Sequence, residues 1–139
     1  MTTLYMLDTN TISYVIKGRS AAARGRLLGL GAHEAGCISA VTEGEIRYGL
    51  ERRPEAVALR RLAEMLLASI RVVPWGRDEA QAYGELRAKM EASGKVLGHM
   101  DMLIAAHAVA LGAVLVTSDK AFRQVDGLRG VEDWAGDLG

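Results

Sequence analysis

The stretch Tyr5-Met6-Leu7-Asp8-Thr9-Asn10 ends an apolar run with an acidic residue. The run from Leu4 to Leu7 predicts a short buried strand, and a helical segment follows it. An aspartate at the end of a buried strand lies at the carboxyl edge of the sheet, where open α/β folds bind their ligands. Because an ionised carboxylate is costly to remove from water, we expect Asp8 to meet a cation, a set of hydrogen-bond donors or solvent.

Short apolar strands alternate with helical segments along the rest of the chain, which is typical of an α/β fold with a central, mainly parallel β-sheet flanked by α-helices. We expect a single domain over residues 1–139, without an internal repeat or a linker. The expected strands are 4–7, 35–39, 71–74, 114–117 and 131–134. The expected helices are 9–17, 21–30, 40–52 behind a Ser39 cap, 54–69, 78–92, 101–111 and 120–124, with a loop at 95–100.

The composition excludes several classes of protein. Apolar residues make up 50% of the chain and only two prolines occur, which argues against disorder. No stretch approaches the roughly 18 apolar residues of a membrane span, and no signal peptide is visible, so we expect a cytoplasmic protein without a membrane partner. Cys37 is the sole cysteine and lies in a predicted buried strand, so we interpret it as a packing residue in a reducing compartment.

The charges balance, because Lys+Arg and Asp+Glu both number 17. The net charge of zero therefore gives no indication of nucleic-acid binding. Any affinity for RNA has to come from local basic residues, for which the candidates are Lys17, Arg19, Arg47, Lys95 and Lys120. The pairs Arg52-Arg53 and Arg60-Arg61 are interpreted as solvated helix faces.

Glu45 is the second acidic candidate. Helical spacing places it on one face with Val41 and Tyr48, so we expect its side chain to be at least half buried. The alternative is a capping box, in which Thr42 and Glu45 would close the start of a helix. Ser39 already offers a cap for the same helix, which favours the functional interpretation.

Glu43, two residues earlier, has a different expected role. Arg47 lies four residues further on, and side chains at this spacing pair on a helix surface. We therefore interpret Glu43 as a solvated acid and Glu45 as the functional one.

Two more aspartates lie at the ends of predicted elements. Asp101 opens the apolar helix 101–111, and Asp119 follows the strand 114–117. Each alone is an ordinary helix-capping aspartate. In a parallel sheet, however, both can converge with Asp8 and Glu45 at the carboxyl edge.

Several carboxylates in a small volume raise one another's pKa values, and a divalent cation relieves their repulsion. Ligands that are all oxygen atoms favour Mg²⁺ or Mn²⁺. Such a site suits phosphodiester hydrolysis, because one metal ion activates a water molecule and a second stabilises the leaving oxygen. RNA would be steered to it by nearby basic side chains and helix amino termini.

The histidines form no zinc-binding pattern with Cys37. His107 shares a helix face with Leu103, Ile104 and Leu111, so we interpret it as a core histidine with its hydrogen bonds satisfied. His99 lies in the expected loop before Asp101 and is a weaker candidate for substrate contact.

Four motifs occur in an order that matches a known family. They are Met6-Leu7-Asp8-Thr9-Asn10, the segment from Ile38 through Glu45 to Gly49, Asp101-Met102-Leu103-Ile104-Ala105-Ala106-His107-Ala108, and Leu115-Val116-Thr117-Ser118-Asp119. The chain resembles a PIN-domain ribonuclease and, within that family, the VapC toxins of bacterial toxin–antitoxin pairs. The resemblance extends over essentially the whole chain, down to residues 131–134.

The resemblance implies that Asp8, Glu45, Asp101 and Asp119 hold Mg²⁺ or Mn²⁺. It implies that Thr117 supports the first acid and that Asn10 helps to orient Asp8 or the substrate. VapC-like proteins typically cleave a single-stranded loop of a structured RNA, often a transfer RNA, and so stop translation; bases in such loops are exposed for recognition. They typically form homodimers and are inhibited by a VapB-like antitoxin whose tail covers the active site.

Two other functions compete with the nuclease. A phosphatase or phosphotransferase would use Asp8 as the nucleophile with Mg²⁺, but such sites usually have a second acid two residues later, where this chain has Asn10. A non-catalytic RNA- or protein-binding module on the same fold is the other alternative, because a fold does not determine a function. That alternative predicts that the acids are dispensable.

Overall fold

The computed structural model describes residues 1–138, so Gly139, the last residue of the expected domain, lies outside the described part. Its sheet contains the strands β1 (Thr3–Leu7), β2 (Glu34–Ser39), β3 (Arg71–Val73), β4 (Val114–Val116) and β5 (Gly130–Glu132). The strand order is β3-β2-β1-β4-β5, and every pairing between neighbours is parallel. The prediction of a parallel α/β fold is therefore confirmed.

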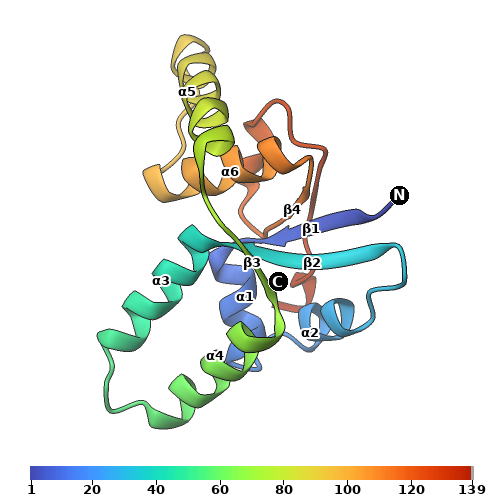
Figure 1. Ribbon diagram of the computed structural model, residues 1–139, viewed down its shortest axis with the longest axis vertical. Helices are drawn as coiled ribbons and strands as arrows, with labels where there is room; N and C mark the ends of the chain where they lie inside the picture. The colour runs from blue at the N-terminus through green and yellow to red at the C-terminus, as the bar shows by residue number, and fades with distance from the viewer. Residues whose placement is uncertain (139) are drawn as a thin grey trace.

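Helices cover both faces of this sheet (Figure 1). They are α1 (Thr9–Ile16), α2 (Ala21–Leu28), α3 (Ala40–Glu51), α4 (Val57–Ser69), α5 (Arg77–Ala92) and α6 (His99–Leu111), with the short 3-10 helices η1 (Lys120–Gln124) and η2 (Gly136–Leu138). Helices α5 and α6 lie on one face, and α1, α2 and α4 lie on the other. Helix α3 follows β2 directly, so it begins at the carboxyl edge of the sheet, beside α6 (Figure 1).

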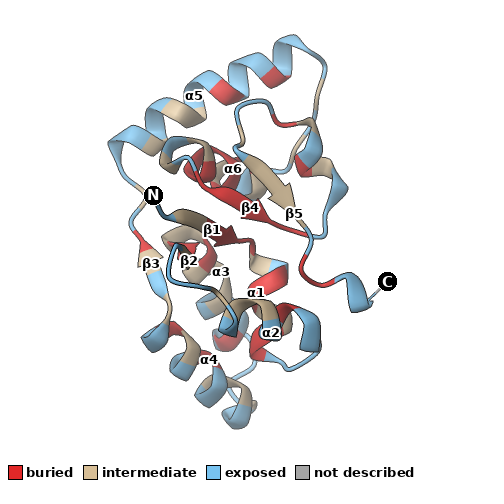
Figure 2. Ribbon diagram, turned by 90° about the vertical axis from the view of Figure 1, so that its right-hand side faces the viewer, coloured by how far each residue is buried: buried red, intermediate tan, exposed pale blue. Residues whose placement is uncertain are grey.

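The central strand β1 contributes to both hydrophobic cores. Tyr5 and Leu7 pack into the core shared with α1, α2 and α4, whereas Met6 packs into the core shared with α5 and α6. Side chains alternate between the two faces of a strand, so a strand covered on both faces needs apolar residues at every position. Figure 2 shows this burial along β1 and its neighbour β4.

Helix α4 begins three residues later than Pro54, where the sequence predicted its start. Pro54 and Glu55 instead form a turn, which the Ala56 backbone N–H closes by donating to the Arg53 carbonyl oxygen at 3.0 Å. Proline suits a turn as well as it suits a first helical turn, and local sequence does not distinguish the two.

Most other boundaries differ from the prediction by one or two residues, and two of these differences change the surroundings of a named residue. Helix α6 begins at His99 and not at Asp101, because Gly98 takes the extended backbone of an N-cap there. Strand β5 ends at Glu132, and Trp134 leaves the sheet to pack its ring 5.3 Å from the ring of Tyr5. Asp101 is therefore not the cap of its helix but lies within its first turn.

Candidate active site

Asp8 lies directly after β1, at the carboxyl edge of the sheet. The register pairs Leu7 with Val116 of β4, so Thr117 lies beside Asp8 on the neighbouring strand. The Thr117 hydroxyl donates to Asp8 Oδ2 at 2.6 Å, and the Thr11 backbone N–H donates to Asp8 Oδ1 at 2.9 Å. These two bonds fix both carboxylate oxygens of a side chain that is only 4% exposed.

The environment of Asp8 disfavours its charge. Burial raises the pKa of the Asp8 carboxyl above its usual range, and the negative charge of Asp119 adds to this. The hydrogen bonds from Thr117 and Thr11 act in the opposite direction but do not cancel the effect of burial. A buried carboxyl with a raised pKa at a sheet edge is a common property of functional sites.

Glu45 is held by a neighbour of Asp8. The Thr9 hydroxyl donates to Glu45 Oε1 at 2.6 Å and lies 3.4 Å from the Thr42 hydroxyl. The capping box is excluded, because Ser39 is the N-cap of α3 and accepts from the Val41 backbone N–H.

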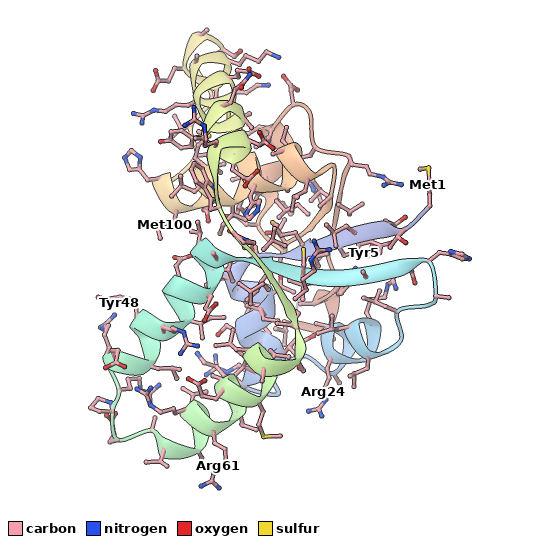
Figure 3. All side chains as sticks on the ribbon, in the orientation of Figure 1. Met1, Tyr5, Arg24, Tyr48, Arg61 and Met100 are labelled. Atoms are coloured by element: carbon pink, nitrogen blue, oxygen red, sulfur yellow. The ribbon has the colours of Figure 1, made fainter. Side chains whose placement is uncertain are left out.

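The reasoning that led to Glu45 was nevertheless partly wrong. Tyr48 is 63% exposed and projects away from the domain (Figure 3). The face of α3 that packs inward is formed by Thr42, Ile46 and Leu50. Glu45 borders this face, so it is half buried for a different reason than the one expected.

Glu43 forms the expected surface ion pair. Its Oε2 atom lies 2.7 Å from Arg47 Nε, and Arg47 also reaches Glu64 Oε1 on α4 at 2.9 Å. Arg47 therefore links α3 to α4 through two carboxylates. The guanidinium group of Arg47 is thus already paired with carboxylates, and an RNA phosphate would have to compete with them.

Asp101 is close to the other three acids. Burial raises the pKa of the Asp101 carboxyl, and the charges of Asp119, Asp8 and Glu45 raise it further. The combined effect means that the four carboxylates share one region at the carboxyl edge of the sheet. Within residues 1–138 no group donates a hydrogen bond to the Asp101 side chain.

Asp119 is the most exposed member of this group. It is the N-cap of η1, where its Oδ1 atom accepts from the Ala121 backbone N–H at 2.9 Å. Its own backbone N–H donates to the Thr117 hydroxyl at 3.0 Å. Thr117 therefore connects Asp119 to Asp8 through one hydroxyl group.

The donor set fits an oxygen-preferring divalent cation, because the four side chains supply only carboxylate oxygens. Each of Asp8, Glu45 and Asp119 is directed towards its own hydrogen-bond donor. Accordingly, within residues 1–138 no three His, Cys, Asp or Glu side chains are grouped tightly enough to hold an ion.

The other candidate residues are more scattered. Asn10 is exposed on α1, and the donors to Asp8 are Thr11 and Thr117 instead. Lys95 lies 3.5 Å from Asp126, and with His99 it lines a cavity between α5 and α6. Lys120 is exposed at the start of η1, next to Asp119.

His99 points away from the acids. It is the first residue of α6, and two residues of helix place His99 and Asp101 on nearly opposite sides of the axis. His99 faces Tyr83 and Met102 in the cavity beside α5. A loop before Asp101, as expected, would not have fixed the direction of His99, whereas the two additional helical residues fix it.

A groove of about 310 Å³ begins at Thr9 and Glu45 and runs between α1, α3 and α4. Lys17, Arg52 and Arg53 line it together with apolar side chains that include Ile16, Ile46 and Leu59. Lys17 was predicted to contact RNA, whereas Arg52-Arg53 were interpreted as solvated helix faces. Both arginines follow the end of α3, the helix that carries Glu45.

Thr9 is a further residue that sequence analysis missed. Its hydroxyl reaches an acid 36 positions away, and nothing in the local sequence indicates that partner. Its place directly after a strand-end aspartate was the available signal. No helix in residues 1–138 is long and apolar enough to cross a membrane.

Comparison with known proteins identifies the family of this chain. The model of the PIN domain family matches residues 5–128, which include all four acids. A VapC described as a tRNA(fMet)-specific endonuclease, from Shigella flexneri, is 35% identical over 133 residues, covering 94% of this chain and 98% of the relative. The chain belongs to the VapC ribonucleases of the PIN-domain family.

Solved VapC structures share the fold along nearly the whole chain. The complex VapBC2 from Rickettsia felis, bound to a DNA fragment from its promoter, contains a chain that matches with a TM-score of 0.88 and 29% identity, covering 95% of this chain and 99% of that one. VapBC from Salmonella typhimurium, also bound to DNA, matches with a TM-score of 0.81 and 32% identity over 96% of this chain and 99% of that one.

Proposed function

We propose that this VapC ribonuclease cleaves RNA at a site where Asp8, Glu45, Asp101 and Asp119 hold Mg²⁺ or Mn²⁺. The observation that carries the proposal is the raised pKa of Asp101, which results from burial and from the charges of the other three acids. Carboxylates placed this close together destabilise one another unless a cation joins them. The bound cation would supply an activated water molecule and neutralise charge at the scissile phosphate.

The chain's own residues orient the four acids. Thr117 holds Asp8 and the backbone of Asp119, while Thr9 holds Glu45. Preorganised ligands lose little freedom when the cation binds, so these hydroxyl groups favour its binding. Asp119 at the outer edge is accessible to solvent, which suits a group that contacts both the cation and incoming water.

We further propose a structured RNA, such as a transfer RNA, as the substrate, because the relative from Shigella flexneri is described as tRNA(fMet)-specific. A VapB-like antitoxin is the proposed inhibitor, because the matching Rickettsia felis and Salmonella typhimurium chains come from VapBC complexes. A homodimer is the proposed assembly. The cytoplasm, where transfer RNA acts, is the proposed location.

The direct test is cleavage of total bacterial RNA by purified protein with Mg²⁺, with Mn²⁺ and with EDTA. We expect a discrete product with either cation and none with EDTA, and sequencing its ends identifies the cleaved bond. No cleavage of any RNA by folded, metal-loaded protein free of antitoxin would favour the binding-module alternative.

The groove beside Glu45 is the proposed path for the RNA strand. Within residues 1–138 neither Lys17 nor Arg52 forms an ion pair, and the Arg52 guanidinium lies 5.6 Å from the centre of the Tyr48 ring. Both cations are therefore accessible to phosphate groups on a strand that leaves the acids through the groove.

We expect the double variant Lys17→Ala/Arg52→Ala to bind RNA about tenfold more weakly at low salt, because two phosphate contacts are lost. The slope of log K against log salt concentration should fall by roughly 2. Filter binding across a salt series in EDTA measures both quantities without cleavage. Arg24→Ala is the matched control, because Arg24 is an exposed cation on α2 outside the groove (Figure 3). An unchanged slope in the double variant would place the RNA elsewhere.

A further inference from the structure

His107 is the buried polar group that the proposed function does not use. It lies on α6, its side chain is fully buried, and its Nδ1 atom lies 2.7 Å from the Ser39 hydroxyl. Its Nε2 atom has no hydrogen-bond partner within residues 1–138. The expectation of a fully satisfied core histidine was therefore wrong for one of the two ring nitrogens.

The hydrogen bonds of Ser39 determine where the ring proton lies. Ser39 Oγ already accepts from the Val41 backbone N–H at 3.1 Å. If the serine hydroxyl donates to Nδ1, the hydroxyl both donates and accepts a hydrogen bond, and the N–H group at Nε2 is the one group without a partner. The reverse direction would leave the serine proton and Nε2 both unpaired, so the ring is neutral with its proton on Nε2.

This bond joins two helices that carry acids of the site. Ser39 ends β2 and caps α3, which carries Glu45. His107 lies on α6, six residues after Asp101. Within residues 1–138, the other hydrogen bond from α6 to a distant element runs from Trp75 Nε1 to the Leu103 carbonyl oxygen, at 3.1 Å.

The position of Asp101 depends on the hydrogen bonds that hold α6 more than the positions of the other acids do. Thr117, Thr9 and Ala121 hold the side chains of Asp8, Glu45 and Asp119, whereas Asp101 receives no hydrogen bond within residues 1–138. The position of its carboxylate therefore follows the position of α6 alone.

Resting on the proposed metal site, we propose that His107 and Ser39 are positioning residues that fix Asp101 relative to Glu45. Packing alone does not explain the histidine, because a leucine would fill a similar volume without burying an unpaired N–H. Groups that orient metal ligands change metal affinity when they are removed, even though they do not touch the ion.

The test is calorimetric binding of Mn²⁺ to the metal-free full chain, with thermal melting in EDTA as a separate measure of stability. We expect His107→Leu to bind Mn²⁺ about tenfold more weakly while its melting temperature stays equal or rises. His107→Asn, whose amide replaces the Nδ1 atom, should bind Mn²⁺ within about threefold of wild type.

Ser39→Ala provides the second arm and keeps the test valid if His107→Leu fails to fold. It should weaken Mn²⁺ binding by a similar factor, and Ser39→Ala/His107→Leu should be no worse than the single variants, because both remove the same bond. Ser20→Ala is the matched control, since Ser20 is also fully buried and also caps a helix, accepting from the Ala23 N–H at 3.0 Å. It should lower the melting temperature without changing Mn²⁺ affinity.

Two results would overturn the positioning role. One is wild-type Mn²⁺ affinity in folded His107→Leu and Ser39→Ala proteins. The other is an equal loss of affinity in His107→Asn and His107→Leu, which would indicate ring packing and not the bond to Ser39. A wild-type protein that binds no Mn²⁺ at all would instead contradict the proposed metal site itself.

Discussion

Asp8→Asn is expected to reduce the rate of RNA cleavage by more than about a hundredfold, because it removes the charge of the most buried acid at the site while keeping its volume. Removing groups that only support a metal ligand already costs about 10-fold to 100-fold, so loss of a ligand should cost more. The fold should survive, since the amide oxygen of the introduced asparagine can still accept from the Thr11 N–H.

The same substitution is expected to leave the melting temperature in EDTA equal or higher. Burial raises the pKa of Asp8, which means that the folded protein disfavours its charged form at neutral pH. A neutral amide removes that unfavourable charge. Kinetics with Mg²⁺ and thermal melting in EDTA measure the two effects separately.

Asp78→Asn is the matched control for Asp8→Asn, because Asp78 is an exposed aspartate in the first turn of α5. Its cleavage rate should stay within about twofold of wild type, as expected for a surface substitution away from special contacts. A folded Asp8→Asn protein that cleaves RNA at the wild-type rate would remove Asp8 from the metal site.

Glu45→Gln and Glu43→Gln should differ strongly in activity although they lie two residues apart on α3. Glu45 faces Thr9 and the other acids, so its loss should reduce cleavage by about tenfold or more. Glu43 pairs with Arg47 on the surface, and such pairs contribute little, so its loss should change cleavage by less than about twofold.

The pair of variants is informative because the two changes are chemically identical. Cleavage rates at saturating Mg²⁺, together with Mg²⁺ titrations, distinguish weaker metal binding from slower chemistry. A loss of activity in Glu43→Gln as large as that in Glu45→Gln would show that the surface pair with Arg47 contributes to RNA binding or to the position of α3.

The sequence predicted the positions of acids that follow from element boundaries. Asp8 and Asp119 were chosen as candidates because each follows an apolar strand, and a parallel sheet brings such positions to one edge. Glu45 was predicted as a site residue partly through Tyr48, which is exposed, and Glu45 and Glu43 are both only partly buried. A helix presents more than one partly buried stripe, and only the tertiary contacts show which one packs.

Contacts between distant residues were beyond local reasoning. Thr9 meets Glu45, and His107 meets Ser39, across 36 and 68 positions, and these pairs depend on how α3 packs against α1 and α6. The start of α6 was also missed, because Gly98 gave no side-chain signal for a cap. Those two additional helical residues determine which way His99 points.

The strand order also governs when this enzyme can become active during its own synthesis. Strand β1 pairs with β4, which begins at Val114 and is followed by Thr117 and Asp119. A nascent chain therefore contains Asp8 long before it contains Thr117 or Asp119. Until β4 emerges from the ribosome and pairs with β1, Asp8 lacks its second hydrogen bond and the edge of the sheet is incomplete. The proposed metal site is therefore one of the last parts of this fold to be completed, because Thr117 and Asp119 follow the strand that closes it.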